Sequence, residues 1–199
     1  MQQIAIVGQH FSNKIEVISL PLSSRIHQIS CRYHQLFILT QEGTVYQFGS
    51  SKLLEPITAL QNKNVIRIFC GHERTFFLID DNSVFAIGDN GYNQLGLDGL
   101  FHPSSGDFLP KFTHPSKSVS ETIVTDIACA YSFSVFCLNR DCVVVYGQNW
   151  INTNATPDNQ PFKANLTLEQ DEYITSLTAG SFHVFALTNL GQVYSGGES

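Results

Sequence analysis

The sequence predicts an all-β protein that is built from repeated antiparallel units. Four segments of the 199-residue chain repeat the same apolar pattern when they are aligned on a glycine. Within each segment, β-branched and aromatic residues form short alternating runs that are separated by turn-forming residues, as is typical of strands. Helical periodicity is weak throughout the chain, so strands are expected in every unit.

The repeat is defined by one glycine column and six apolar columns that align without gaps. The glycine column holds Gly49, Gly88, Gly147 and Gly197. The apolar columns hold Ile26, Val65, Val124 and Ile174; Ile29, Ile68, Ile127 and Leu177; Cys31, Cys70, Cys129 and Ala179; Leu39, Leu78, Cys137 and Leu187; Val45, Val84, Val143 and Val193; and Tyr46, Phe85, Val144 and Tyr194. Agreement at so many positions is the signature of a repeat architecture.

The strands within a unit are best seen in the first one. The runs 36–39 and 44–48 are expected to form strands, and Gln41-Glu42-Gly43 lies between them. The corresponding turns are Asp80-Asp81-Asn82 and Asn189-Leu190-Gly191. Glycine and asparagine tolerate the positive φ angles that tight hairpins need, so each pair of runs is expected to form a hairpin.

The spacing of the units predicts propeller blades. Successive glycines of the column lie 39, 59 and 50 residues apart, or about 49 residues per unit. Four-stranded units of this period are typical of a β-propeller or a related array, and the chain accommodates about four. The expected units are 1–25 (a partial blade), 26–64, 65–123, 124–173 and 174–199. The run 4–8 resembles the last strand of a unit, so either a blade shared between the chain ends or a fragment of a larger propeller is expected.

Composition and charge exclude several classes of protein. Apolar residues make up 43% and charged residues 14% of the chain, which excludes a disordered protein. The net charge is −6 and no two Lys or Arg residues are adjacent, which argues against general nucleic-acid binding. The N-terminus lacks a basic region before its short apolar run, and no run is long enough to span a membrane. A cytoplasmic or nuclear protein is therefore expected.

The segment from Gly88 to Leu97, GDNGYNQLGL, resembles the signature of the regulator of chromosome condensation repeat, which reads roughly G-x-N-x-x-G-Q-L-G. Asn93 replaces one glycine of that signature. The segments 179–187 and 191–194 resemble its other half, although the histidine of the family is kept only as His183. The resemblance implies a seven-bladed β-propeller, and it implies guanine-nucleotide exchange on a small GTPase as one activity.

A candidate partner-binding face is formed by the turns that follow the small-residue column. By the repeat, these turns lie on one face of the array. Its candidate residues are Tyr33, His34, His72, Arg74, Tyr131, Phe182 and His183. Aromatic and arginine side chains are enriched in protein interfaces. In the alternative interpretation, each turn only caps its own hairpin.

Two long insertions supply candidate anchors for a partner. The insertion 98–122 is rich in proline and glycine and carries Phe101, Phe108 and Phe112. The second, 150–165, carries Trp150. Exposed aromatic side chains on long loops can anchor a partner, or they can pack on their own blade.

No residue is predicted to act in catalysis or to bind a metal or cofactor. Cys70-Gly71-His72 places a thiol beside an imidazole, but Cys70 belongs to a repeat column that is expected to need a small buried side chain. The five cysteines show no C-x-x-C spacing and the seven histidines no metal-ligand spacing. Cys142 lies outside the column.

The function expected from the sequence is that of a non-catalytic protein-interaction scaffold with a protein partner. The alternative is a guanine-nucleotide exchange factor that acts on a small GTPase through one face of the propeller. No exchange residue of the family can be matched in this chain. Self-association is left open.

Overall fold

The computed structural model describes residues 2–6, 16–20, 24–49, 53–96, 106–109, 112, 116–148 and 161–197, the first two ranges as backbone strands only. In these ranges the regular structure is β-strand apart from two 3₁₀ turns, η2 (Thr58–Leu60) and η3 (Val119–Glu121). The all-β prediction is confirmed. Within the same ranges, no helix has the length and apolar character needed to cross a membrane.

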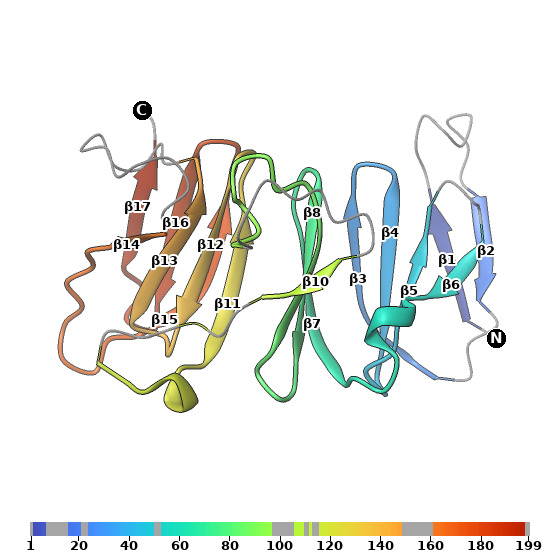
Figure 1. Cartoon of the computed structure of the whole chain (residues 1–199), viewed down its shortest axis with the longest axis horizontal. Coiled ribbons are helices and arrows are strands. Elements are labelled where there is room, and N and C mark those ends of the chain that lie inside the picture. The colour runs from blue at the N-terminus through green and yellow to red at the C-terminus, as the bar shows by residue number, and fades with distance from the viewer. Residues whose placement is uncertain are drawn as a thin grey trace.

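Four antiparallel sheets follow one another along the chain and stand side by side (Figure 1). Sheet 1 contains β3 (Ile26–Arg32), β4 (Gln35–Thr40), β5 (Val45–Phe48) and β6 (Leu54–Pro56). Sheet 2 contains β7 (Val65–Cys70), β8 (Arg74–Ile79), β9 (Val84–Gly88) and β10 (Asp107–Phe108). Sheet 3 contains β11 (Val124–Cys129), β12 (Phe133–Leu138), β13 (Cys142–Gly147) and β14 (Phe162–Ala164), and sheet 4 contains β15 (Ile174–Ala179), β16 (His183–Thr188) and β17 (Val193–Gly197). These sheets are about four propeller blades, as predicted.

A separate strand pair stands at the N-terminal end of the row. β1 (Gln2–Ile6) pairs antiparallel with β2 (Glu16–Leu20). The pair stands at the right of Figure 1, at the sheet 1 end of the row, while β17 lies at the opposite end. The two ends of the array are therefore far apart.

The core consists of apolar layers between successive sheets. We call the front face of a sheet the face that carries the Leu39, Leu78, Cys137 and Leu187 column, and the opposite face its back face. The front face of each of the first three sheets packs on the back face of the next sheet, through Phe37, Leu39 and Val45 in sheet 1, Phe76, Leu78 and Val84 in sheet 2, and Val135, Cys137 and Val143 in sheet 3. These nine side chains are 0–4% exposed. The apolar columns of the sequence are thus the contacts between sheets.

Every sheet has a register shift at the same repeat position. The shift lies in the first strand, just before Gln28, Arg67, Asp126 or Ser176. A bulge re-aims the side chains that follow it. These four residues pair with the Leu39 column and so lie on the front faces.

The turns adopt the backbone conformations that the sequence predicts. Gly43 and Asn82 have φ angles of +77° and +63° in the hairpin turns of sheets 1 and 2. Gly147 closes the third strand of sheet 3 with φ +112°, and a Cβ there would lie 2.4 Å from the carbonyl oxygen of Ser132. Glycine is therefore needed at this position of the column for two reasons: the backbone has a positive φ angle, and there is no space for a Cβ atom.

Candidate partner-binding surface

Four exposed rings from four different sheets form a continuous row. The ring centroids of Tyr33 and His72 lie 5.6 Å apart, those of His72 and Tyr131 5.2 Å, and those of Tyr131 and Phe182 6.3 Å. Tyr33, Tyr131 and Phe182 are between 38% and 73% exposed, and the His72 side chain is 46% exposed. We call these four residues the aromatic row. The row brings together four of the seven residues predicted from the sequence.

The turns between the first and second strands position the row. Tyr33 occupies its turn with a φ of +36°. The backbone N–H of Tyr131 donates to the carbonyl of Ser181 at 3.1 Å, which joins the turns of sheets 3 and 4. Glu73, whose side chain is about half exposed, follows His72 and places a carboxylate beside the row.

The two remaining histidines of the predicted face are also exposed, but they are placed differently. The ring of His34 lies 4.0 Å from that of Tyr33 and so extends the aromatic row at its sheet 1 end. His183 begins β16 and faces solvent. Their assignment to a partner surface stays a prediction.

Arg74 is buried, so its predicted role in partner binding is wrong. Its side chain is 0% exposed and crosses from sheet 2 to sheet 3. There its Nε donates to the Ser134 hydroxyl at 2.9 Å and its Nη2 donates to the carbonyls of Phe133, at 2.8 Å, and Ala130. Burial lowers the pKa of Arg74, and the carbonyl dipoles solvate the charge in place of water.

A second arginine makes a similar link between sheets 1 and 2. Arg32 Nη1 donates to the carbonyls of Glu73, at 2.7 Å, and Ile87, at 3.2 Å. Its Nε donates to Oε1 of Gln35 within sheet 1 at 2.8 Å. The two arginines thus tie neighbouring sheets together close to the turns that carry the aromatic row.

Sequence reasoning missed the polar links that follow the bulges. Gln28 exchanges two hydrogen bonds with the backbone of Ile68 in sheet 2, at 2.7 and 2.9 Å. Arg67 of sheet 2 pairs with Asp126 of sheet 3 at 2.8 Å, and Asp126 accepts a 2.6 Å bond from the Leu177 N–H in sheet 4. Gln28, Arg67 and Asp126 occupy the same position of the repeat, one residue before the Ile29 column. This shared polar position is the sequence signal that could have revealed the links.

The predicted loop anchors divide into three cases. Phe112 packs on the core, with its ring 4.7 Å from that of Phe136, so its assignment as a partner anchor is wrong because it fills its own array. Phe108 lies in β10, 37% exposed, and its ring contacts Phe85 at 5.0 Å. Phe101 and Trp150 lie outside the described residues.

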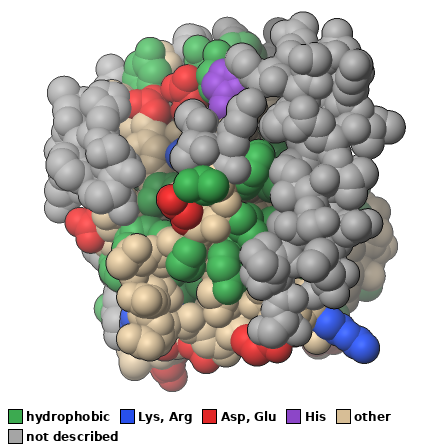
Figure 2. All heavy atoms as spheres, turned by 90° about the vertical axis from the view of Figure 1, so that its right-hand side faces the viewer, with side chains coloured by type: hydrophobic (Ala, Val, Ile, Leu, Met, Phe, Trp, Pro, Cys, Tyr) green, Lys and Arg blue, Asp and Glu red, His purple; other side chains and the backbone are tan. Residues whose placement is uncertain are grey.

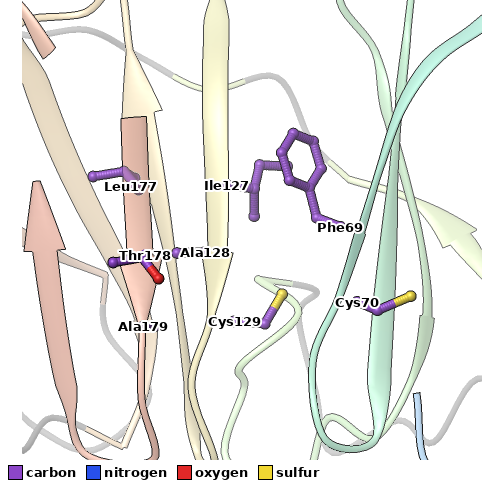
Figure 3. Close-up of a pocket in the computed structure, with 8 residues that line it drawn as sticks. All are labelled: Phe69, Cys70, Ile127, Ala128, Cys129, Leu177, Thr178 and Ala179. Atoms are coloured by element: carbon purple, nitrogen blue, oxygen red, sulfur yellow. The ribbon is translucent and has the colours of Figure 1, made fainter. Parts of the chain in front are cut away.

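The small-residue column lines a pocket of about 200 Å³ between the first strands of sheets 2, 3 and 4 (Figure 3). Cys70 and Cys129 contribute thiols to it, with Ile127 and Phe69 on facing strands. The column is only partly buried and Cys31 is exposed, which corrects the expectation of a buried column. The first strands of sheets 2, 3 and 4 line this pocket together.

The pocket thiols are poor candidates for a nucleophile. Burial raises the pKa of Cys129 to about 12, and burial likewise raises the pKa of Cys70. Both thiols are protonated near neutral pH, whereas attack requires the thiolate. The His72 imidazole lies between the rings of Tyr33 and Tyr131. Cys70 therefore lines the pocket and His72 belongs to the aromatic row, and these positions explain the Cys70-Gly71-His72 motif without a catalytic role.

The signature segment that follows Gly88 is a self-bonded loop between sheets 2 and 3. Asn90 accepts a hydrogen bond from the Leu95 N–H at 2.8 Å, and Gln94 donates to Asp89 at 2.7 Å. Leu95 is fully buried in the core between the two sheets. Gly96, at φ +73°, lies against the ring of Tyr146. The signature residues thus specify this connection.

Comparison with protein families supports the interpretation of the repeats. The family model of the Regulator of chromosome condensation (RCC1) repeat matches residues 81–137. The E3 ubiquitin-protein ligase HERC2 of Homo sapiens is 25% identical over 211 residues, which cover 96% of this chain and 4% of HERC2. An RCC1 repeat-containing protein of Schizosaccharomyces pombe is 28% identical over 147 residues, which cover 69% of this chain and 40% of that protein. The chain therefore spans less than half the length of these relatives.

Solved propeller structures share the fold. Human WBSCR16 superimposes with a TM-score of 0.76 at 19% identity, over 93% of this chain and 50% of that one. Yeast RCC1 (Prp20), in its complex with Kap60, gives 0.70 at 19% identity over 92% of this chain and 46% of Prp20. These structures show that the chain has a β-propeller fold, and the family-model match at residues 81–137, together with the two relatives, shows that the chain is similar to RCC1 repeat proteins.

Proposed function

We propose that the chain is a non-catalytic protein-interaction module that binds its partner through the aromatic row. The observation that carries the proposal is the continuity of the row, since Tyr33, His72, Tyr131 and Phe182 come from four sheets and their ring centroids are 5.2–6.3 Å apart. Each ring remains at least 38% exposed. A row of this kind offers several adjacent anchor points to one partner.

The chemistry of the row suits protein recognition. Tyrosine and other aromatic side chains are enriched among the residues that contribute most to binding. They offer a large contact area with few rotatable bonds, which limits the entropy lost on association. Sheets tied together by Arg32, Arg74 and Gln28 hold the turns in place before a partner arrives. The proposal is thus one of a preorganised surface.

A double substitution in the row tests the proposal. Tyr33→Ala with Tyr131→Ala removes the two most exposed rings of the row and is expected to weaken partner binding about 100-fold, if each ring contributes about 1.4 kcal/mol. Partners are first captured from lysate with the wild-type chain, and the dissociation constant of the purified pair is then measured by titration calorimetry.

Tyr173→Ala is the matched control. Tyr173 is 39% exposed just before β15, whereas the aromatic row follows the other end of the first strands. Its removal is expected to leave binding within about twofold of wild type. Equal affinity for the double variant and the wild type, with both folded by circular dichroism, would contradict the proposal.

A nucleotide-release assay separates this proposal from guanine-nucleotide exchange. Prp20p is described by its binding to Gsp1p and histones, and the resemblance to the regulator of chromosome condensation repeat implies a small GTPase as partner, so Gsp1p is a reasonable first partner to assay. An interaction module is expected to leave the release of fluorescent GDP unchanged. Acceleration that depends on the concentration of the chain would overturn the non-catalytic part of the proposal.

A further inference from the structure

A chain of hydrogen bonds runs beneath the aromatic row and joins the same four turns. These turns lie along the upper edge of the array in Figure 1. Hydrophobic, acidic and histidine side chains lie at this edge when the molecule is viewed from its sheet 1 end (Figure 2). Each turn is bonded to the next one, so the rings and the bonds follow the same path across the four sheets.

Arg32 makes the link between the turns of sheets 1 and 2. It immediately precedes Tyr33, the first ring of the row. Its Nη1 donates to the carbonyl of Glu73, the residue after His72, at 2.7 Å. Its Nε donates to Oε1 of Gln35 at 2.8 Å, across the sheet 1 turn. The guanidinium therefore connects both ends of this turn to the backbone beside the second ring.

Arg74 makes the corresponding link between sheets 2 and 3. It lies two residues after His72, and its Nη1 and Nη2 donate to the carbonyl of Tyr131 at 3.0 and 3.1 Å. Tyr131 is the third ring of the row, and its own N–H donates to the carbonyl of Ser181, the residue before Phe182. Each link thus runs from a residue at or within two positions of one ring to a carbonyl at or next to the following ring.

We infer that Arg32 and Arg74 are positioning residues that set the spacing of the rings in the aromatic row. A guanidinium donates in fixed directions within one plane, so each arginine fixes the distance between two turns as well as joining them. A binding surface that lacks such supporting contacts is loose by about 1 Å. The inference rests on the proposed function, because the spacing of the rings matters to a partner only if the row binds it.

The competing explanation is that contacts between the rings themselves set the spacing. The centroids of Tyr33, His72 and Tyr131 lie within the range of favourable ring contacts, and such contacts would persist without the arginines. Tyr33 is 73% exposed, and a ring so open to solvent has few neighbouring atoms to hold it. This exposure favours the arginine at the first junction of the row.

Arg32→Met tests the inference at that junction. The carbonyl of Glu73 keeps the N–H of Asp89 as a donor at 2.9 Å, so the variant is expected to fold. The ring centroids of Tyr33 and His72 lie 5.6 Å apart. The nuclear Overhauser effect between their ring protons is expected to weaken about threefold if the rings separate by about 1 Å. Arg32→Lys retains a single donor group and is expected to recover part of that signal.

Gln28→Met is the matched control, since Gln28 also joins sheets 1 and 2. It exchanges two hydrogen bonds with the backbone of Ile68, but it lies four residues before Arg32, or about 13 Å along the strand. Its replacement is expected to lower the thermal midpoint as Arg32→Met does and to leave the Overhauser effect between Tyr33 and His72 unchanged. An unchanged effect in Arg32→Met, or equal losses in the two variants, would overturn the inference.

A binding measurement separates this inference from the proposed function. With the partner captured by the wild-type chain, Arg32→Met is expected to weaken binding about tenfold and Gln28→Met by less than about twofold. A weakened Overhauser effect with unchanged affinity would support the positioning role of Arg32 and contradict binding through the row. An unchanged Overhauser effect, together with weak binding by the double variant of Tyr33 and Tyr131, would overturn the inference and support the proposed function.

Discussion

Gly147→Ala should lower the free energy of unfolding by about 3 kcal/mol or more, because the site excludes a side chain in two ways. The backbone holds φ at +112°, which lies outside the regions that residues with a Cβ normally adopt. An added Cβ would also lie 2.4 Å from the Ser132 carbonyl oxygen and 2.8 Å from the Phe133 Cα. Both neighbours are backbone atoms, so the strand pairing itself would have to shift. Urea denaturation followed by circular dichroism measures the effect.

Gly180→Ala is the matched control for this substitution. Gly180 also follows a strand, but an added Cβ would meet no atom within 4 Å, and its φ lies outside the positive range. Its replacement is expected to leave stability unchanged or to raise it by up to about 1 kcal/mol, because alanine restricts the unfolded chain. Similar losses of stability in the two variants would show that the positive φ and the contact with Ser132 do not explain the glycine column.

Arg74→Met is expected to lower the free energy of unfolding by about 3 kcal/mol. Methionine fills part of the volume, but it removes the guanidinium from the carbonyl of Ala130 and leaves the carbonyl of Phe133 with the Ala130 N–H as its remaining donor. Each unsatisfied buried carbonyl costs about 1–3 kcal/mol, and relief from burying a charge offsets part of that loss. Thermal and urea denaturation of the purified variant measure the change.

Two further substitutions distinguish geometry from charge in this link. Arg74→Lys keeps the charge but replaces the planar fork by a single ammonium, so it is expected to recover less than half of the lost stability. Lys63→Ala removes an exposed pair with Asp81 and is expected to change stability by less than about 1 kcal/mol. A stability for Arg74→Met within about 0.5 kcal/mol of wild type would show that the link between sheets 2 and 3 lies elsewhere.

The strands were predictable because their signals are local. Short apolar and β-branched runs such as 36–39, together with a turn residue such as Gly43 or Asn82, specify a hairpin without knowledge of the rest of the molecule. Repetition of the same columns then indicated that the hairpins form similar sheets. The contacts between sheets follow from those columns, since an apolar position that recurs in every unit needs a similar neighbour in each.

The site was only partly predictable, since a turn position does not reveal which way its side chain points. His72 lies in the turn before β8 and Arg74 begins β8 two residues later, yet Arg74 crosses to sheet 3 and His72 lies in the exposed row. The direction depends on the distance to the next sheet and on which carbonyls are left unpaired there. The register shift before Arg67 similarly re-aims a side chain in a way that the apolar pattern does not encode.

The apolar layers between successive sheets mean that the stability of each sheet depends mainly on its nearest neighbours in the row. Each of the sheets 2 and 3 touches one sheet on either side, whereas sheet 4 touches one described neighbour. Stability in such an array is approximately a sum over units and the junctions between nearest neighbours. Sheet 4 is therefore expected to open locally before sheets 2 and 3, and amide protons of β15–β17 are expected to exchange with solvent sooner than those of β8 and β12.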